Sequence, residues 1–295
     1  MLLNILNIIE KFTQSKSLKE LPDMILTALQ EDDMKKMVYE IYKEYQDFMC
    51  ITDMPKYKIY FKSKGKGCLL HSLDMAAEEY EQGTYNLYVS DVAYDSNIRK
   101  EVLYHEFTHI YDREFLYNKY RFGKEGKLAD INTHPFTEIH AEQVRFLYML
   151  GCKNINDNPK GINHNAVVWD INSRSLAFYD YLKDSKDRID NVFVKGVDKI
   201  KHRHKKISKA IIGNMVDQLL YYIGALSIYI RYCNYKNDEL MDLSNVNACW
   251  HVEIDKVIDL YCNNDITTLQ KIDIVKTSEI MMCDFVRCAE SIGIL

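Results

Sequence analysis

His105-Glu106-Phe107-Thr108-His109 places two histidines four positions apart, with a glutamate directly after the first. On a helix, side chains four residues apart lie on one face, one turn from each other. Two imidazoles so arranged can bind the same metal ion, and zinc commonly takes histidine and carboxylate ligands. A glutamate beside the first ligand is suited to activate a metal-bound water. The stretch therefore predicts a helix that carries a zinc site.

The residues around this motif predict one helix from Asp95 or Ser96 to about Tyr117. Apolar residues at helical spacing form a stripe that anchors one side of this helix: Leu103, Phe107 and Ile110. A second stripe contains both histidines of the motif and Asp112. We therefore expect a helix that packs on one side and presents the motif on another.

A catalytic zinc site usually has three protein ligands and one water, so a third ligand must come from elsewhere. Phe115 stands six residues after His109, where the metzincins have their third ligand, and this excludes that class. Glu138 lies 29 residues beyond His109 (138 − 109), on a helix predicted from Pro135 to Gly151. It is the predicted third ligand.

Other polar residues near these ligands have several possible roles. Glu142 is one turn after Glu138 and can accept a hydrogen bond from a ligand imidazole. Asp112, on the face of His109, is either another orienting carboxylate or an alternative third ligand. His134 lines the cleft or caps its helix, and His140 points away from Glu138 as a structural or exposed histidine.

His105-Glu106-x-x-His109 followed by Glu138-x-x-Ala141-Glu142 resembles the gluzincins, the group that includes thermolysin. Over about residues 80–150 it is most similar to the ImmA/IrrE-type metallopeptidases. The resemblance implies that His105, His109 and Glu138 bind one Zn²⁺ ion and that Glu106 is the general base. Glu142 takes a place usually held by Asp or Asn. A tyrosine or histidine of the second lobe is implied as oxyanion donor, but the 22 tyrosines leave the choice open.

The alternation in residues 84–90 predicts a strand whose one face carries Tyr85, Leu87 and Val89. It precedes the motif helix, where the resembled family has the edge strand that pairs with an extended peptide. The resemblance thus implies a substrate-binding edge whose other face carries Asn86, Tyr88 and Ser90. Residues 57–62 and a segment that starts near 68 predict two further strands.

The whole pattern predicts an α+β fold in three segments. Residues 1–50 form a helical segment with breaks at Leu21-Pro22 and at residues 31–33. Residues 51–155 form a zincin-like core with a small, mostly antiparallel sheet, the active-site helix and the third-ligand helix. Residues 156–295 form a large all-helical lobe. The helices expected in this lobe lie near 166–182, 186–209, 210–234, 247–262 and 274–292.

Charge and composition limit the partners. Asp and Glu outnumber Lys and Arg, 43 to 38, so no general attraction to nucleic acid or anionic membrane is expected. The basic run at residues 199–206 has no interleaved aromatic residues and is interpreted as a solvated surface. The eight cysteines form no C-x-x-C pair and are expected to be reduced thiols. The apolar stretch 210–230 contains Asn214, Asp217 and Gln218, so it is expected to be a buried helix.

The leading prediction is a cytoplasmic, zinc-dependent metallopeptidase that cleaves a peptide or protein substrate, with no membrane or nucleic-acid partner. Metal-activated water would attack the peptide bond, with Glu106 as general base. The alternative is a catalytically degenerate zincin-like module that binds a protein or nucleic-acid partner through its groove and basic run. The intact Glu106 favours the enzyme, because a binding module has no use for a base beside the metal. Substrate identity and oligomeric state are left open.

Overall fold

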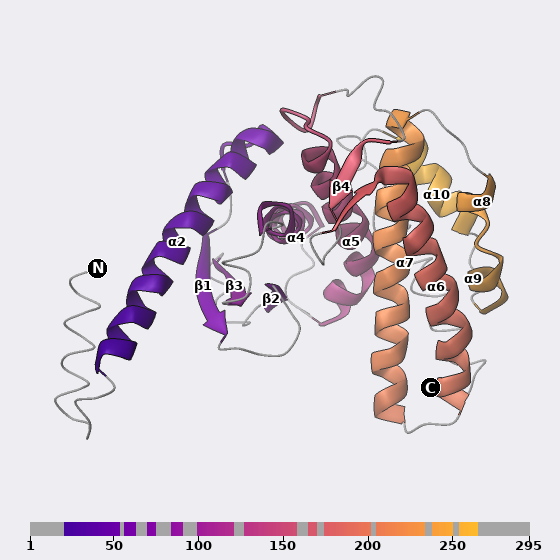
Figure 1. Ribbon diagram of the computed structural model, residues 1–295, viewed down its shortest axis with the longest axis horizontal. Helices are drawn as coiled ribbons and strands as arrows, with labels where there is room; N and C mark the ends of the chain where they lie inside the picture. Colours follow the sequence, from indigo (N-terminus) through magenta and orange to yellow (C-terminus); the bar gives the residue numbers. More distant parts are fainter. Residues whose placement is uncertain are drawn as a thin grey trace.

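The computed structural model describes residues 21–53, 56–62, 70–74, 84–90, 99–120, 127–157, 165–169, 174–201, 205–233, 238–249 and 254–264. Its N-terminal half contains α2 (Leu21–Met49), β1 (Lys56–Lys62), β2 (Leu70–Asp74), β3 (Thr84–Ser90), α4 (Arg99–Tyr120) and α5 (Lys127–Met149). Then follow β4 (Val167–Trp169), β5 (Ser175–Ala177), α6 (Phe178–Lys201), α7 (Lys205–Cys233), α8 (Asp238–Met241), α9 (Ser244–Cys249) and α10 (Ile254–Asn263). In Figure 1, α4 lies between the sheet and α5, α7 covers the far side of α5, and α6 packs on α7. This is the expected α+β class, mostly helical with small sheets.

The larger sheet has the strand order β1-β3-β2, with β1 parallel and β2 antiparallel to β3. The strand predicted at 84–90 is confirmed, with the buried Leu87 on its inner face. Its predicted edge position is wrong. Asn86 and Tyr88 are paired with β1 on one side and β2 on the other, and Ser90 is paired with β1. The reason is the parallel pairing with β1, which alternation within one strand does not specify. Among the described strands, β2 is an edge strand, and it packs against α4.

The N-terminal helix α2 is continuous from Leu21 to Met49, so the predicted break at residues 31–33 is wrong. Acidic residues inside a helix cost only a few tenths of a kcal/mol each. Burial of one apolar stripe outweighs that cost: Met34, Val38, Ile41, Tyr45 and Phe48. The helix expected before Leu21 falls outside the described residues.

The two helices that carry the predicted ligands are longer than their sequences suggest. α4 runs on to Tyr120, while its predicted start at residues 95–96 lies outside the described residues. α5 begins at Lys127 rather than at the predicted Pro135, which lies inside the helix. The predicted end is confirmed. Gly151 has φ +80°, and Cys152 N–H donates to the Leu147 carbonyl at 3.1 Å, as in a Schellman cap.

The C-terminal part departs from the all-helical expectation at its start. Residues predicted as a helix at 166–182 instead form the antiparallel hairpin of β4 and β5, and α6 begins only at Phe178. α7 already starts at Lys205, so the predicted boundary at 209–210 is also wrong. The helix predicted at 274–292 lies outside the described residues. Residues 211–233 of α7 are long and apolar enough to span a membrane, but 67% of the apolar window is buried against the rest of the fold.

Close packing between α5 and α7 positions the candidate site. A Cβ on Gly224 of α7 would lie 2.7 Å from Glu142 Cβ and 2.8 Å from the Ile139 carbonyl oxygen. Only glycine permits this approach of the two backbones. One turn further along, Gln143 Nε2 donates to Ser227 Oγ at 2.8 Å. α7 is therefore held directly against the helix that supplies Glu138 and Glu142.

Candidate metal centre

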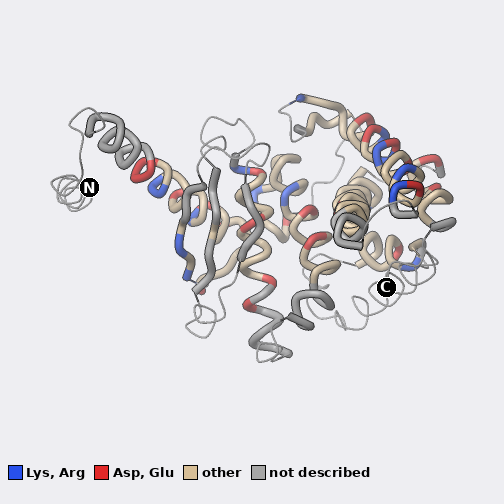
Figure 2. Tube along the Cα trace, turned by 90° about the horizontal axis from the view of Figure 1, so that it is seen from below, with Lys and Arg blue, Asp and Glu red and all other residues tan. Residues whose placement is uncertain are grey.

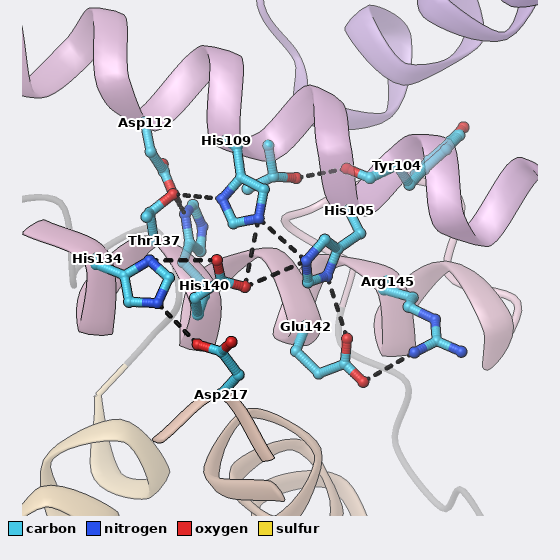
Figure 3. Close-up of polar contacts among 12 residues, drawn as sticks. Tyr104, His105, His109, Asp112, His134, Thr137, His140, Glu142, Arg145 and Asp217 are labelled. Carbon is cyan, nitrogen blue, oxygen red and sulfur yellow. Dashed lines mark hydrogen bonds and ion pairs between the residues drawn. The ribbon is translucent and has the colours of Figure 1, made fainter. Parts of the chain in front are cut away.

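Three ligand-type atoms from α4 and α5 meet in one place. His105 Nε2 and His109 Nε2 are 3.0 Å apart, and each lies 3.4 Å from Glu138 Oε2. All three side chains are buried, and Glu138 Oε2 accepts no hydrogen bond within the described residues. Figure 3 shows the two imidazoles on α4 facing the carboxylates on α5. The predicted ligands are thus brought together in a group that can hold a metal ion.

His105 is oriented by a carboxylate and a guanidinium. Its Nδ1 lies 3.2 Å from Glu142 Oε2, and Arg145 Nη1 donates to Glu142 Oε1 at 2.9 Å. The Glu142–Arg145 pair favours the tautomer of His105 with the proton on Nδ1, so the Nε2 lone pair of His105 points at the shared centre. The structure therefore places Glu142 as the orienting carboxylate that its position suggested.

His109 is oriented by a hydroxyl that the sequence did not point to. Its Nδ1 lies 2.8 Å from Thr137 Oγ1, on the residue just before Glu138. With Nδ1–H donating to this oxygen, Nε2 of His109 also presents a lone pair to the centre. Two imidazole lone pairs and a carboxylate oxygen thus converge, and only a cation or a proton makes such an arrangement stable.

Asp112 is not at the centre. Both of its oxygens lie within 2.9 Å of His140 Nδ1, and the two side chains are almost fully buried. Asp112 is therefore neither a ligand in this arrangement nor the orienting partner of His105 or His109. His140 does point away from Glu138, but it is buried in an ion pair rather than exposed.

His134 and Asp217 connect the centre to α7. His134 Nδ1 lies 3.4 Å from Glu138 Oε1, and its Nε2 lies 2.9 Å from Asp217 Oδ1. Figure 3 shows this imidazole between the ligand helix and the carboxylate from α7. Glu138 is therefore held through one oxygen while the other faces the two ligand imidazoles.

Tyr221, also on α7, lies over His105, with the ring centroids 5.7 Å apart in an edge-on contact. Burial raises the pKa of its hydroxyl, and the charges of Glu138, Asp217, Glu142 and Glu106 raise it further. The phenol therefore keeps its proton beside the cluster. Glu106 is buried next to His105 on α4 and is one of the charges that act on this hydroxyl.

The electrostatics of the cluster favour positive charge. Burial alone would lower the pKa of His105, but its contacts with Glu138 and Glu142 outweigh this effect and raise the pKa to about 10. Burial has the opposite effect on a carboxylate and alone would raise the pKa of Glu138, yet the neighbouring imidazoles hold this pKa well below its usual range. The buried carboxylates therefore stabilise a cation among the three ligand atoms.

Four residues of this arrangement were not predicted: Thr137, Arg145, Asp217 and Tyr221. Arg145 follows Glu142 by three residues, a spacing at which helical side chains meet, so the sequence carried a signal for it. Asp217 and Tyr221 lie one turn apart on α7, far from the motif in sequence. Asn86, Tyr88 and Ser90 lie on the central strand β3.

The chain matches no known protein-family model, no curated protein sequence and no solved structure.

Proposed function

We propose that this protein is a zinc-dependent metallopeptidase of the gluzincin type. His105, His109 and Glu138 would hold one Zn²⁺ ion, and Glu106 would act as the general base. The supporting observation is the convergence of three ligand atoms at 3.0, 3.4 and 3.4 Å. Zinc–ligand bonds of about 2.0–2.2 Å in a tetrahedron separate ligand atoms by about 3.3–3.6 Å. The carboxylate contacts already have this spacing, and the imidazoles need to separate by only a few tenths of an ångström.

Bound zinc supplies a water whose pKa is lowered toward ~7 and polarises the scissile carbonyl. Glu106 removes the proton from the attacking water and passes it to the leaving amine. Tyr221 keeps its hydroxyl proton and can donate it as a hydrogen bond to the oxygen on which negative charge develops. The Glu142–Arg145 pair keeps the Nε2 atom of His105 directed at the ion.

The extended substrate is proposed to lie along β2 rather than along β3. Among the described strands, β2 has an unpaired edge, runs antiparallel to β3, and packs against the motif helix α4. A peptide added to that edge would satisfy its backbone groups in the strand-addition mode. It would also lie beside the helix that carries Glu106.

The test has two parts on the full-length protein. Metal analysis after dialysis should find one zinc ion per chain, and a fluorescently labelled unfolded protein such as casein should be hydrolysed. Glu106→Gln should retain the zinc and lose about 10²–10⁴-fold in activity, because it removes only the base. Absence of zinc, or full activity in Glu106→Gln, contradicts the proposal. Bound zinc without hydrolysis would instead support a degenerate binding module.

A further inference from the structure

A cavity of ≈ 710 Å³ lies between α6 and α7, outside the metal centre. Its polar lining consists of Arg188, Asn191, Lys195 and Lys199 from α6, with Asn214 and Gln218 from α7. No carboxylate lines it among the described residues. Val192, Gly196 and Ile211 add apolar surface.

Among the described residues, no carboxylate pairs with the basic residues of the cavity. They recur at positions 188, 195 and 199, which form one stripe of the helix. In the described part of the chain, Arg188 donates to the Asp184 carbonyl and to Ser185 Oγ, not to a carboxylate. The acidic residues of α6 include Asp184 and Asp190, which pair with Arg174 and Lys186 instead.

This charge is a local feature. Acidic and basic residues are interspersed along the described chain in Figure 2, and the whole protein has a formal net charge of −5. The described lining of the cavity, with three cations, three side-chain amides and no carboxylate, therefore differs from its surroundings. Exposed cations of this kind favour an anionic ligand, and the amides can hydrogen-bond a peptide backbone or a carboxylate.

The cavity adjoins the metal centre through α7. Gln218 lines the cavity, while the preceding residue, Asp217, bonds His134 beside Glu138. Consecutive helical residues are about 100° apart, so Asp217 and Gln218 lie on neighbouring faces of α7, one toward the metal centre and the other toward the cavity. Tyr221, one turn after Asp217, lies over His105. The cavity and the metal centre therefore lie on neighbouring faces of α7.

We infer that this cavity is an exosite that binds an acidic segment of the polypeptide substrate, an inference that rests on the proposed peptidase function. Polypeptide is favoured over nucleic acid because none of the described residues that line the cavity is aromatic and could stack on a base. The apolar residues Val192 and Ile211 suit a peptide with mixed side chains better than a bare phosphate.

Fluorescence anisotropy of a labelled twelve-residue peptide tests the inference on zinc-loaded Glu106→Gln protein, which binds without cleaving. A peptide with four glutamates should bind at least about fivefold more tightly than the same peptide with four glutamines. The double substitution Lys195→Gln with Lys199→Gln should abolish this preference. Lys153→Gln with Lys183→Gln removes two exposed lysines outside the cavity and should retain it.

Equal affinity for the two peptides overturns the inference, as does a preference that survives Lys195→Gln with Lys199→Gln. Displacement of the acidic peptide by single-stranded DNA at a tenfold lower concentration than by unlabelled peptide also overturns it, in favour of a nucleic-acid site. The casein assay separates the two proposals. If casein is hydrolysed but the acidic peptide is not preferred, the proposed peptidase function stands and the proposed exosite is wrong. If the acidic peptide is preferred but casein is not hydrolysed, the cavity binds acidic peptides and the proposed peptidase function is wrong.

Discussion

Two histidine–carboxylate clusters join α4 to α5, and they differ in what they leave unsatisfied. In the Asp112–His140 pair, both carboxylate oxygens contact the same imidazole nitrogen. In the metal centre, the carboxylate of Glu142 binds Nδ1 of His105, and Nε2 is left to face another imidazole and Glu138. The Asp112–His140 pair leaves one buried ring nitrogen, His140 Nε2, without a partner among the described residues, while the other cluster gathers three electron-rich atoms around a space that suits a cation. The same residue types therefore form a buried pair in one place and a group that can hold a metal ion in the other.

The largest expected effect is the loss of a ligand from the metal centre. His109→Ala removes one of three converging atoms, and zinc affinity should fall by more than the ~10–100-fold that loss of an orienting partner costs. Competition with a chelator of known affinity measures the change. The double variant Asp112→Leu with His140→Leu is the matched control, because it removes a buried histidine together with its carboxylate partner, neither of which faces the centre. If both variants lose zinc equally, the distinction between the two clusters is wrong.

The second effect concerns stability rather than metal. His140→Leu leaves the Asp112 carboxylate buried without its imidazole partner, which should cost about 3–5 kcal/mol of unfolding free energy. Urea denaturation of the metal-free protein measures this loss. Adding Asp112→Leu to this variant removes the unpaired carboxylate and should restore most of the lost unfolding free energy. A double variant as unstable as the single one would show that the pair does not act as a unit.

Zinc affinity should rise with pH. In the metal-free protein, contacts with Glu138 and Glu142 raise the pKa of His105 to about 10, so a proton must leave when zinc binds. One released proton gives about tenfold tighter binding per pH unit, or about 100-fold between pH 6.5 and 8.5. The stability that this proton gives the metal-free fold is complete below pH 6.5 and is lost as the pH rises through about 10. Glu142→Gln should weaken both trends, and an unchanged slope would exclude Glu142 as a cause.

Much of the metal centre was predictable because helical spacing fixes which side chains share a face. His105 and His109 on one helix, and Glu138 and Glu142 on another, needed only that rule. What spacing could not supply was the way helices cross. The pairing of Asp112 with His140, and of His109 with Thr137, depends on where α4 crosses α5. Asp217 and Tyr221 come from α7, whose position no local pattern encodes.

The sheet shows the same limit. Alternating residues predicted the strand at 84–90 with its bounds, because burial of one face imposes a period of two. The alternation of residues within a strand does not specify which strands pair with it. The position of β3 at the centre of the sheet, rather than at its edge, therefore could not be predicted. A substrate strand is accordingly sought at β2.

The smallest expected effect tests the contact that holds α7 against the metal centre. Gly224→Ala places a Cβ 2.8 Å from the Ile139 carbonyl oxygen and 2.7 Å from Glu142 Cβ, so the helices must move apart at a cost of about 1–3 kcal/mol. Gly213→Ala on the same helix meets nothing within 4 Å and should stabilise the protein by about 0.5–1 kcal/mol. Urea denaturation of both variants measures the contrast. Because α5 carries Glu138 and Glu142, Gly224→Ala should also weaken zinc binding, whereas Gly213→Ala should not. Equal stability of the two variants would mean that α5 and α7 do not approach as closely as Gly224 permits.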